Sequence, residues 1–99
     1  MAQGDADEAI DGAERAARIL QRLFGNEHAV LGATLNLHGR ALLASGQSGA
    51  AEAVLLRALA IQSALAPHGN PATEATRALL AQSREALEQS SEAKHEPAS

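Results

Sequence analysis

Four histidines are the first candidates for chemistry, because histidine is the side chain that most often binds metal ions or moves protons. They are His28, His38, His68 and His95. Their spacing fits neither an H-x3-H nor an H-E-x-x-H arrangement, and the chain has no cysteine to complete a zinc site. His28 and His68 precede expected helices, where they would cap a helix or face solvent. The sequence therefore predicts no metal site, and it places His38 at the edge of the core.

Other catalytic patterns are also missing. Ser45, Ser48 and Ser63 belong to expected turns or helix surfaces, with no histidine–aspartate pair placed to activate them. The acidic residues near the N-terminus complement a helix dipole but do not form a calcium loop. The segment GQSG is too short to cradle a phosphate. We therefore expect no catalytic or cofactor-binding residue, no cofactor and no enzyme activity.

The composition favours one small helical domain. The chain has 99 residues, is rich in alanine and has a single aromatic residue, Phe24. A net charge of −4, without a cluster of Lys or Arg, argues against nucleic-acid binding. The polar start MAQGDADEAIDG is not a signal peptide, and no apolar run is long enough for a membrane span. We expect a cytoplasmic protein, and the Ala-, Leu-, Gly- and Arg-rich composition favours a bacterial source.

The glycines, prolines and capping residues along the chain predict four helices separated by short loops. The expected ranges are about 6–24, 27–44, 49–66 and 71–89, with a disordered polar tail over 90–99. The expected N-caps are Asp5 (in a capping box with Glu8), Asn26, Ser48 and Asn70, the last followed by Pro71. Short loops make neighbouring helices antiparallel. Two all-α arrangements remain, a compact four-helix bundle and a helical-repeat array.

A comparison of the chain with itself favours the repeat array. At a shift of 42 residues, 14 of the 57 overlapping positions are identical. The glycine turns recur in the same register, because Gly4 aligns with Gly46. Each repeat would consist of two helices. In this register the chain begins with the second helix of one repeat, continues with one complete repeat and ends with the first helix of the next. The domain, over residues 1–89, is therefore expected either to belong to a longer array or to have its open ends covered by a partner.

The repeated segments resemble the tetratricopeptide repeat of the kinesin-light-chain type, whose unit is about 42 residues long. HAVLGATLNLHG (28–39) is similar to the first half of that unit, and AEAVLLRALAI (51–61) to the second. AERAARI (13–19) and GNPATEATRALLA (69–81) are similar to the flanking halves, so the resemblance covers about residues 4–89. His38 replaces a leucine of the pattern, and Leu42, Ser48 and Leu55 replace its aromatic residues. The resemblance implies a right-handed superhelix of antiparallel helix pairs.

The packing of the central pair can be argued from the residues themselves. Ala51 and Ala58 lie on one face of a helix with Leu55 between them. With Gly39 on the preceding helix, these small residues allow a close helix crossing. Gly46 tolerates the positive φ that a tight turn requires.

The resemblance also implies a site, because the first helices of such repeats line a concave groove that binds a peptide or a helix. The positions carried over are Ala33, Asn36, Arg40, Leu43 and Ala44, and then Ala75, Ala78, Gln82 and Glu85. Asn36 and Arg40 are four residues apart and share a helix face. Asparagine can hydrogen-bond a peptide group, and arginine can bind a carboxylate with two N–H groups.

The leading interpretation is a non-catalytic protein-protein interaction module, serving as a scaffold, adaptor or docking domain. The alternative from a different class is a homo-oligomerisation element, in which the open half-repeat ends pair with a second copy to form a homodimer. A third alternative is an enzyme accessory or a metal-carrying bundle.

Overall fold

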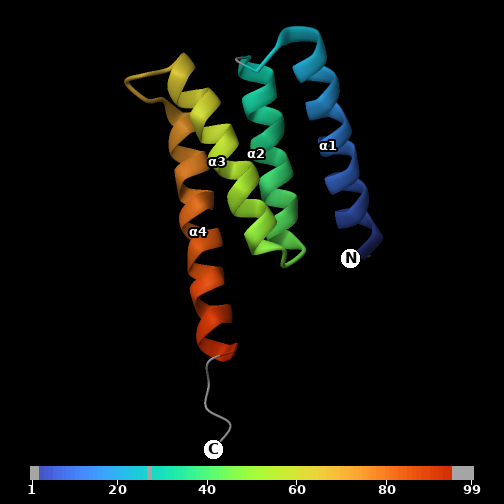
Figure 1. Cartoon of the computed structure of the whole chain (residues 1–99), viewed down its shortest axis with the longest axis vertical. Coiled ribbons are helices and arrows are strands. Elements are labelled where there is room, and N and C mark those ends of the chain that lie inside the picture. The colour runs from blue at the N-terminus through green and yellow to red at the C-terminus, as the bar shows by residue number, and fades with distance from the viewer. Residues whose placement is uncertain (1–2, 27, 95–99) are drawn as a thin grey trace, which may run out of the picture.

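The computed structural model describes the backbone of residues 3–26 and 28–94, and the side chains of residues 7–26 and 28–90. Four helices make up the described chain: α1 (Gln3–Phe24), α2 (Ala29–Ala44), α3 (Ser48–Leu65) and α4 (Pro71–Lys94). Each helix runs antiparallel to the next, as Figure 1 shows. The predicted all-α fold is confirmed.

The helix ends differ from the expected ones at several places. The helix α1 begins at Gln3, so Asp5 lies inside it and is not its N-cap. His28 caps α2 in place of Asn26, because its Nδ1 accepts a hydrogen bond from the Val30 N–H at 3.1 Å. Ser48 is the first residue of α3, and the cap position before it is held by Gln47 without a side-chain hydrogen bond.

The last helix starts where the sequence predicted and continues further. Asn70 Oδ1 accepts hydrogen bonds from the Thr73 N–H at 2.9 Å and the Thr73 hydroxyl at 3.0 Å. Pro71 occupies the first helical position, where its missing N–H costs nothing. The helix then extends to Lys94, so residues 90–94 are helical and not part of a disordered tail. The rest of the predicted tail, residues 95–99, lies outside the described residues.

The helices form an open stack. Along the chain, α2 packs on α1, α3 on α2 and α4 on α3, and α2 also touches α4. Within the described residues α1 and α4 are not in contact, so the stack does not close into a four-helix bundle. Its extents of 54 × 34 × 21 Å reflect this shape. In Figure 1, α1 lies at one edge and α4 at the other.

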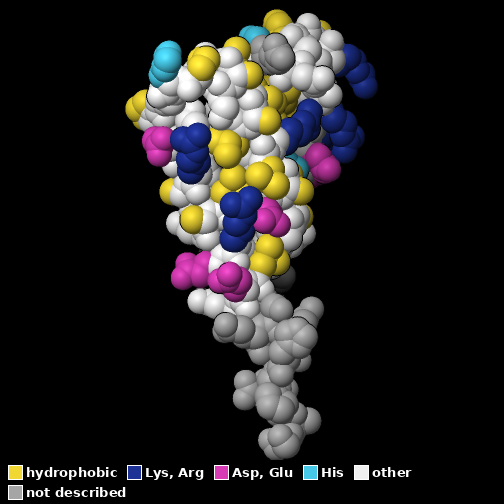
Figure 2. All heavy atoms as spheres, turned by 60° about the vertical axis from the view of Figure 1, so that its left-hand side comes forward, with side chains coloured by type: hydrophobic (Ala, Val, Ile, Leu, Met, Phe, Trp, Pro, Cys, Tyr) yellow, Lys and Arg dark blue, Asp and Glu magenta, His cyan; other side chains and the backbone are white. Residues whose placement is uncertain are grey.

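The surface near α4 is mixed in character. Figure 2 shows Lys and Arg side chains next to Asp and Glu side chains on this face, with hydrophobic ones between them. One ion pair joins two helices, since Arg84 Nε on α4 lies 3.1 Å from Glu52 Oε2 on α3. None of the described helices is both long enough and apolar enough to cross a membrane.

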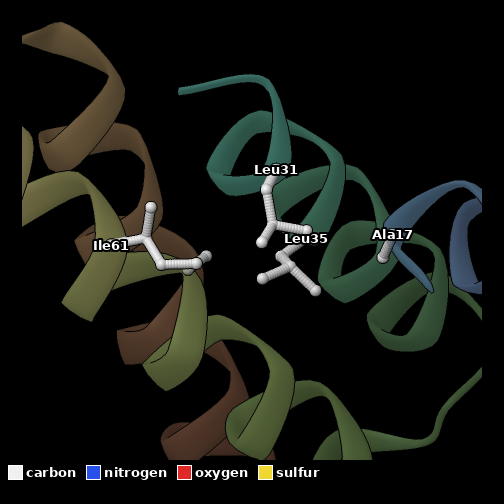
Figure 3. Close-up of a cluster of buried hydrophobic side chains, with 5 residues drawn as sticks. Ala17, Leu31, Leu35 and Ile61 are labelled. Atoms are coloured by element: carbon white, nitrogen blue, oxygen red, sulfur yellow. The ribbon is translucent and has the colours of Figure 1, made fainter. Parts of the chain in front are cut away.

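The core centres on α2 and consists of two clusters. The first cluster joins three helices through Ala17, Leu31, Leu35, Ala58 and Ile61. Figure 3 shows Leu31 and Leu35 of α2 between Ala17 of α1 and Ile61 of α3. The second cluster consists of Leu42, Ala51, Leu55 and Leu80 and joins α2, α3 and α4. Aliphatic side chains and alanine fill both clusters, as a chain with one aromatic residue requires.

The close crossing of α2 and α3 follows the predicted small residues. Ala51, Leu55 and Ala58 are fully buried. A Cβ atom on Gly39 would lie 2.5 Å from both Cγ and Cδ2 of Leu55, so only glycine lets that leucine approach α2. The turn between the two helices depends on Gly46, whose φ of 82° is strained for residues with a side chain.

Candidate protein-binding groove

A shallow hollow opens between α2 and α4, over α3. It has a volume of about 290 Å³. Its lining residues are Ala33, Asn36, Leu37, Gln62, Ala72 and Ala75. Three of these six lining residues are alanines, whose side chains are single methyl groups. The hollow is therefore shallow, and the helix backbones lie close to its surface. Leu37 is 56% exposed and forms an apolar rim on the α2 side.

The floor of the hollow is polar and internally bonded. Asn36 Nδ2 on α2 donates a hydrogen bond to Thr76 Oγ1 on α4 at 2.8 Å. The Thr76 hydroxyl donates to Gln62 Oε1 on α3 at 2.6 Å and lies 3.1 Å from the Ala72 carbonyl oxygen. These contacts link three helices at one point. They hold the Asn36 side chain in one orientation at the edge of the hollow.

This arrangement leaves Asn36 able to bind a ligand. Its Oδ1 has no hydrogen bond within the described residues, and the residue is half-buried. A carboxamide oxygen in that position can accept a hydrogen bond from a peptide N–H. The alanine walls can contact an apolar side chain. The chemistry available is therefore recognition, through one oriented acceptor and an apolar surface.

The structure brings some of the predicted groove residues together and leaves others apart. Ala33, Asn36 and Ala75 line the hollow. Arg40 is exposed one turn beyond Asn36, outside the lining. Leu43 is half-buried and packs against the second core cluster. Ala44, Ala78, Gln82 and Glu85 are exposed and do not line the hollow.

The residues considered for catalysis or metal binding lie at separate places. His38 is buried in α2, at 8% exposure, and His68 is exposed in the turn before α4. His95 lies outside the described residues. In the part of the chain that the structure describes, no three metal-binding side chains come together. Ser45 accepts a hydrogen bond from Gln47 Nε2 at 2.9 Å in the α2–α3 turn.

Three lining residues, Leu37, Gln62 and Ala72, were not predicted. Gln62 carries a signal in the sequence, because at the 42-residue shift it aligns with Leu20 of α1, on the helix face that packs inward. A polar residue at such a position indicates a buried hydrogen-bond partner. The partner, Thr76, is 14 residues away along the chain, and its identity depends on how α4 stacks.

Replacing Thr76 with valine tests this network. Thr76 is fully buried, and its loss leaves Asn36 Nδ2 and Gln62 Oε1 without their shared partner. We expect the free energy of unfolding to fall by about 1–3 kcal/mol in chemical denaturation. Thr34 is the control, since it is the equivalent threonine of the preceding repeat and, within the described residues, its hydroxyl bonds only to the Val30 carbonyl oxygen. Thr34→Val should change stability by less than about 0.5 kcal/mol, and equal losses would contradict the network.

The comparisons with known proteins agree with this architecture. A family model described as tetratricopeptide repeat matches residues 1–64, which include α1, α2 and most of α3. No curated protein and no solved structure matches the chain. The family match covers more than half of the 99 residues, and the antiparallel stack of helices is the one that such repeats form. The chain therefore belongs to the tetratricopeptide repeat family.

Proposed function

We propose that this chain is a non-catalytic interaction module that binds a segment of a partner protein in the hollow between α2 and α4. The family consists generally of protein-protein interaction modules. The observation that carries the proposal is the hydrogen bond from Asn36 Nδ2 to Thr76 Oγ1 at the base of the hollow. This bond holds the Asn36 side chain in place, and Asn36 Oδ1, which has no hydrogen bond within the described residues, can accept one from a ligand. A side chain that is held in place loses little conformational entropy when a ligand binds.

The surroundings of the hollow indicate the chemistry of the ligand. Ala33, Ala72 and Ala75 leave space for one apolar side chain, and Leu37 can contact it from the rim. Arg40 lies one turn further along α2 and is exposed, so it can bind a carboxylate beside the hollow. We infer a peptide or helix in which an apolar residue lies close to an acidic one.

Filling the hollow tests the proposal. Peptides that bind the wild-type chain would be selected from a displayed library, and their affinities would be measured by calorimetry. Ala75→Phe places a ring in the hollow without disturbing the core, because Ala75 is exposed. We expect the selected peptides to bind this variant at least tenfold more weakly. Ala53→Phe adds the same ring to an exposed position of α3 outside the hollow and should leave the affinity unchanged.

The charge of the ligand is tested with the same peptides. Arg40→Glu should weaken the binding of those with an acidic residue and leave the helical circular dichroism signal unchanged, because Arg40 is exposed. If the selected peptides bound Ala75→Phe as tightly as they bind the wild-type chain, their binding site would lie outside the hollow. Equal affinity for Arg40→Glu would remove Arg40 from the site and leave the hollow as the only contact.

The finer family assignment is part of the proposal. The 42-residue period of the identities supports repeats of the kinesin-light-chain-like subtype. A cytoplasmic location and a bacterial source stay predictions from composition.

A further inference from the structure

The outer face of α1 is more apolar than an exposed helix face needs to be. Ile19 is 57% exposed and Leu23 is 67% exposed, and both lie away from the face that packs on α2 through Ala17. Figure 1 shows no helix on the side of α1 that is turned away from α2. We call the surface made by Ala9, Gly12, Ala16, Ile19 and Leu23 the open face of α1.

The internal repeat shows what such a face does elsewhere in the same molecule. At the shift of 42 residues, Ala9, Ala16, Ile19 and Leu23 align with the identical residues Ala51, Ala58, Ile61 and Leu65. On α3, Ala51 and Ala58 are fully buried and Ile61 is 7% exposed, because this part of the face packs on α2, whereas Leu65 at the end of the helix is 48% exposed. The same residue types on α1 have no helix against them in the described structure. The open face is thus a helix-packing surface without a partner.

The opposite end of the stack has a different character. On α2, the residues Gly32, Leu35, Gly39 and Leu42 face α3, and in the repeat register they correspond to Glu74, Arg77, Ala81 and Arg84 of α4. These charges are paired, with 2.9 Å between Arg77 and Glu74 and 3.1 Å between Arg84 and Glu52. A charged outer face is typical of the terminal unit of a repeat stack. Stacking α1 of one copy on α4 of another would bury those charges, so head-to-tail assembly is unfavourable.

The open face is complementary to itself when two copies pair antiparallel. Its residues follow the 3–4 spacing of a helix-packing seam. If the two α1 helices cross at Ala16, Leu23 lies opposite Ala9 of the second copy, and Ile19 lies between its Gly12 and Ala16. Large residues then meet small ones. A Cβ atom on Gly12 would have no neighbour within 4 Å, so no described part of the same chain packs against this glycine.

The charges of α1 favour the same orientation. Its first half carries Asp7, Glu8, Asp11 and Glu14, and its second half carries Arg15, Arg18 and Arg22. Arg15 and Arg18 pair within the helix with Asp11 at 2.7 Å and Glu14 at 3.7 Å. Glu8 and Arg22 take part in no ion pair within the described residues. An antiparallel pair brings Glu8 within reach of Arg22 of the second copy, twice by symmetry, whereas a parallel pair would bring like charges together.

We propose that a second copy of this chain covers the open face of α1, in a two-fold dimer whose α1 helices pack antiparallel about Ala16. This surface is separate from the hollow between α2 and α4, so the dimer and the proposed peptide binding can each fail without the other.

The solution mass tests the dimer. Sedimentation of the 99-residue chain over a hundredfold dilution should give twice the mass of the chain at high concentration. Ile19→Glu and Leu23→Glu should each raise the dimer dissociation constant at least tenfold, with the helical signal retained. Leu56→Glu is the control, because Leu56 is 43% exposed on α3, outside both the open face and the hollow, and should leave the dimer intact. A monomer at every concentration, or a dimer indifferent to Ile19 and Leu23, would overturn the proposal.

Two further variants test the orientation. Glu8→Arg and Arg22→Glu should each weaken the dimer, and the double variant should restore it, since the exchanged charges again meet opposite ones. The chain has no cysteine, so a single introduced thiol reports one contact. Ala16→Cys should form a disulfide-linked dimer on oxidation. Leu23→Cys should not, because the two copies of that position lie about 20 Å apart in an antiparallel pair. Cross-linking at Leu23→Cys would exclude the antiparallel dimer.

Discussion

Ala58→Glu is expected to unfold the domain. Ala58 is fully buried in the cluster with Leu31 and Leu35, so the new carboxylate has no water and no cationic partner. A buried unpaired charge costs about 3–5 kcal/mol, a large part of the 5–10 kcal/mol that stabilises a domain of this size. Far-UV circular dichroism should show loss of most of the helical signal at 25 °C, or a transition moved to much lower temperature.

The matched control for this prediction is Ala60→Glu. Ala60 is two residues further along the same helix and is exposed, so the same substitution places the carboxylate in water. Its stability should stay within about 0.5 kcal/mol of the wild type. If Ala58→Glu were as stable as Ala60→Glu, α3 would not pack on α2 through this face.

The second large effect is expected at the contact between Gly39 and Leu55. Gly39→Ala should destabilise the domain by about 1–3 kcal/mol, although alanine favours helix, because the new methyl group would clash with the Leu55 side chain. Leu55→Ala should cost about 2–4 kcal/mol, because it removes a fully buried side chain from the second core cluster. Urea denaturation of each variant measures both losses.

The double variant tests whether the two residues act through one contact. The methyl group at position 39 enters space that Leu55→Ala vacates, so the combined loss should be smaller than the sum by about 1 kcal/mol or more. Gly49→Ala is the control for the glycine change, since the nearest atom to its Cβ would be Leu87 Cδ2 at 4.0 Å. Additive losses would show that Leu55 does not depend on the absence of a side chain at position 39.

Features that depend on neighbouring residues in the chain could be predicted from the sequence. Asn70 and Pro71 start α4, and Gly46 ends the turn after α2, because caps and tight turns involve only a few successive residues. The burial of Ala51, Leu55 and Ala58 followed from helical spacing and the repeat. The cap of α2 was misplaced, because asparagine is the commoner cap residue and histidine rarely takes that role.

The candidate site could be predicted only in part. The resemblance placed Ala33, Asn36 and Ala75 in a groove, and these three residues line the hollow, whose role in binding stays a prediction. The bond from Asn36 to Thr76 spans 40 residues and depends on the angle at which α4 lies across α2 and α3. Neither residue type nor spacing encodes that angle directly. The ion pair between Glu52 and Arg84 could not be predicted from the sequence for the same reason.

The open stack also shapes how the molecule comes apart. The helix α1 packs on α2, and its one described hydrogen bond to another helix is accepted by Gln21 from Arg57 of α3, at 2.6 Å between exposed side chains. By contrast, α2 is held by all three other helices. Detaching α1 therefore breaks fewer interactions than unfolding the whole, and its amide protons should exchange through a sub-global opening while α2–α4 stay folded. A second copy bound to α1 would stabilise the packed state of this helix and so suppress its separate unfolding. In the dimer, all four helices would then unfold together in one transition.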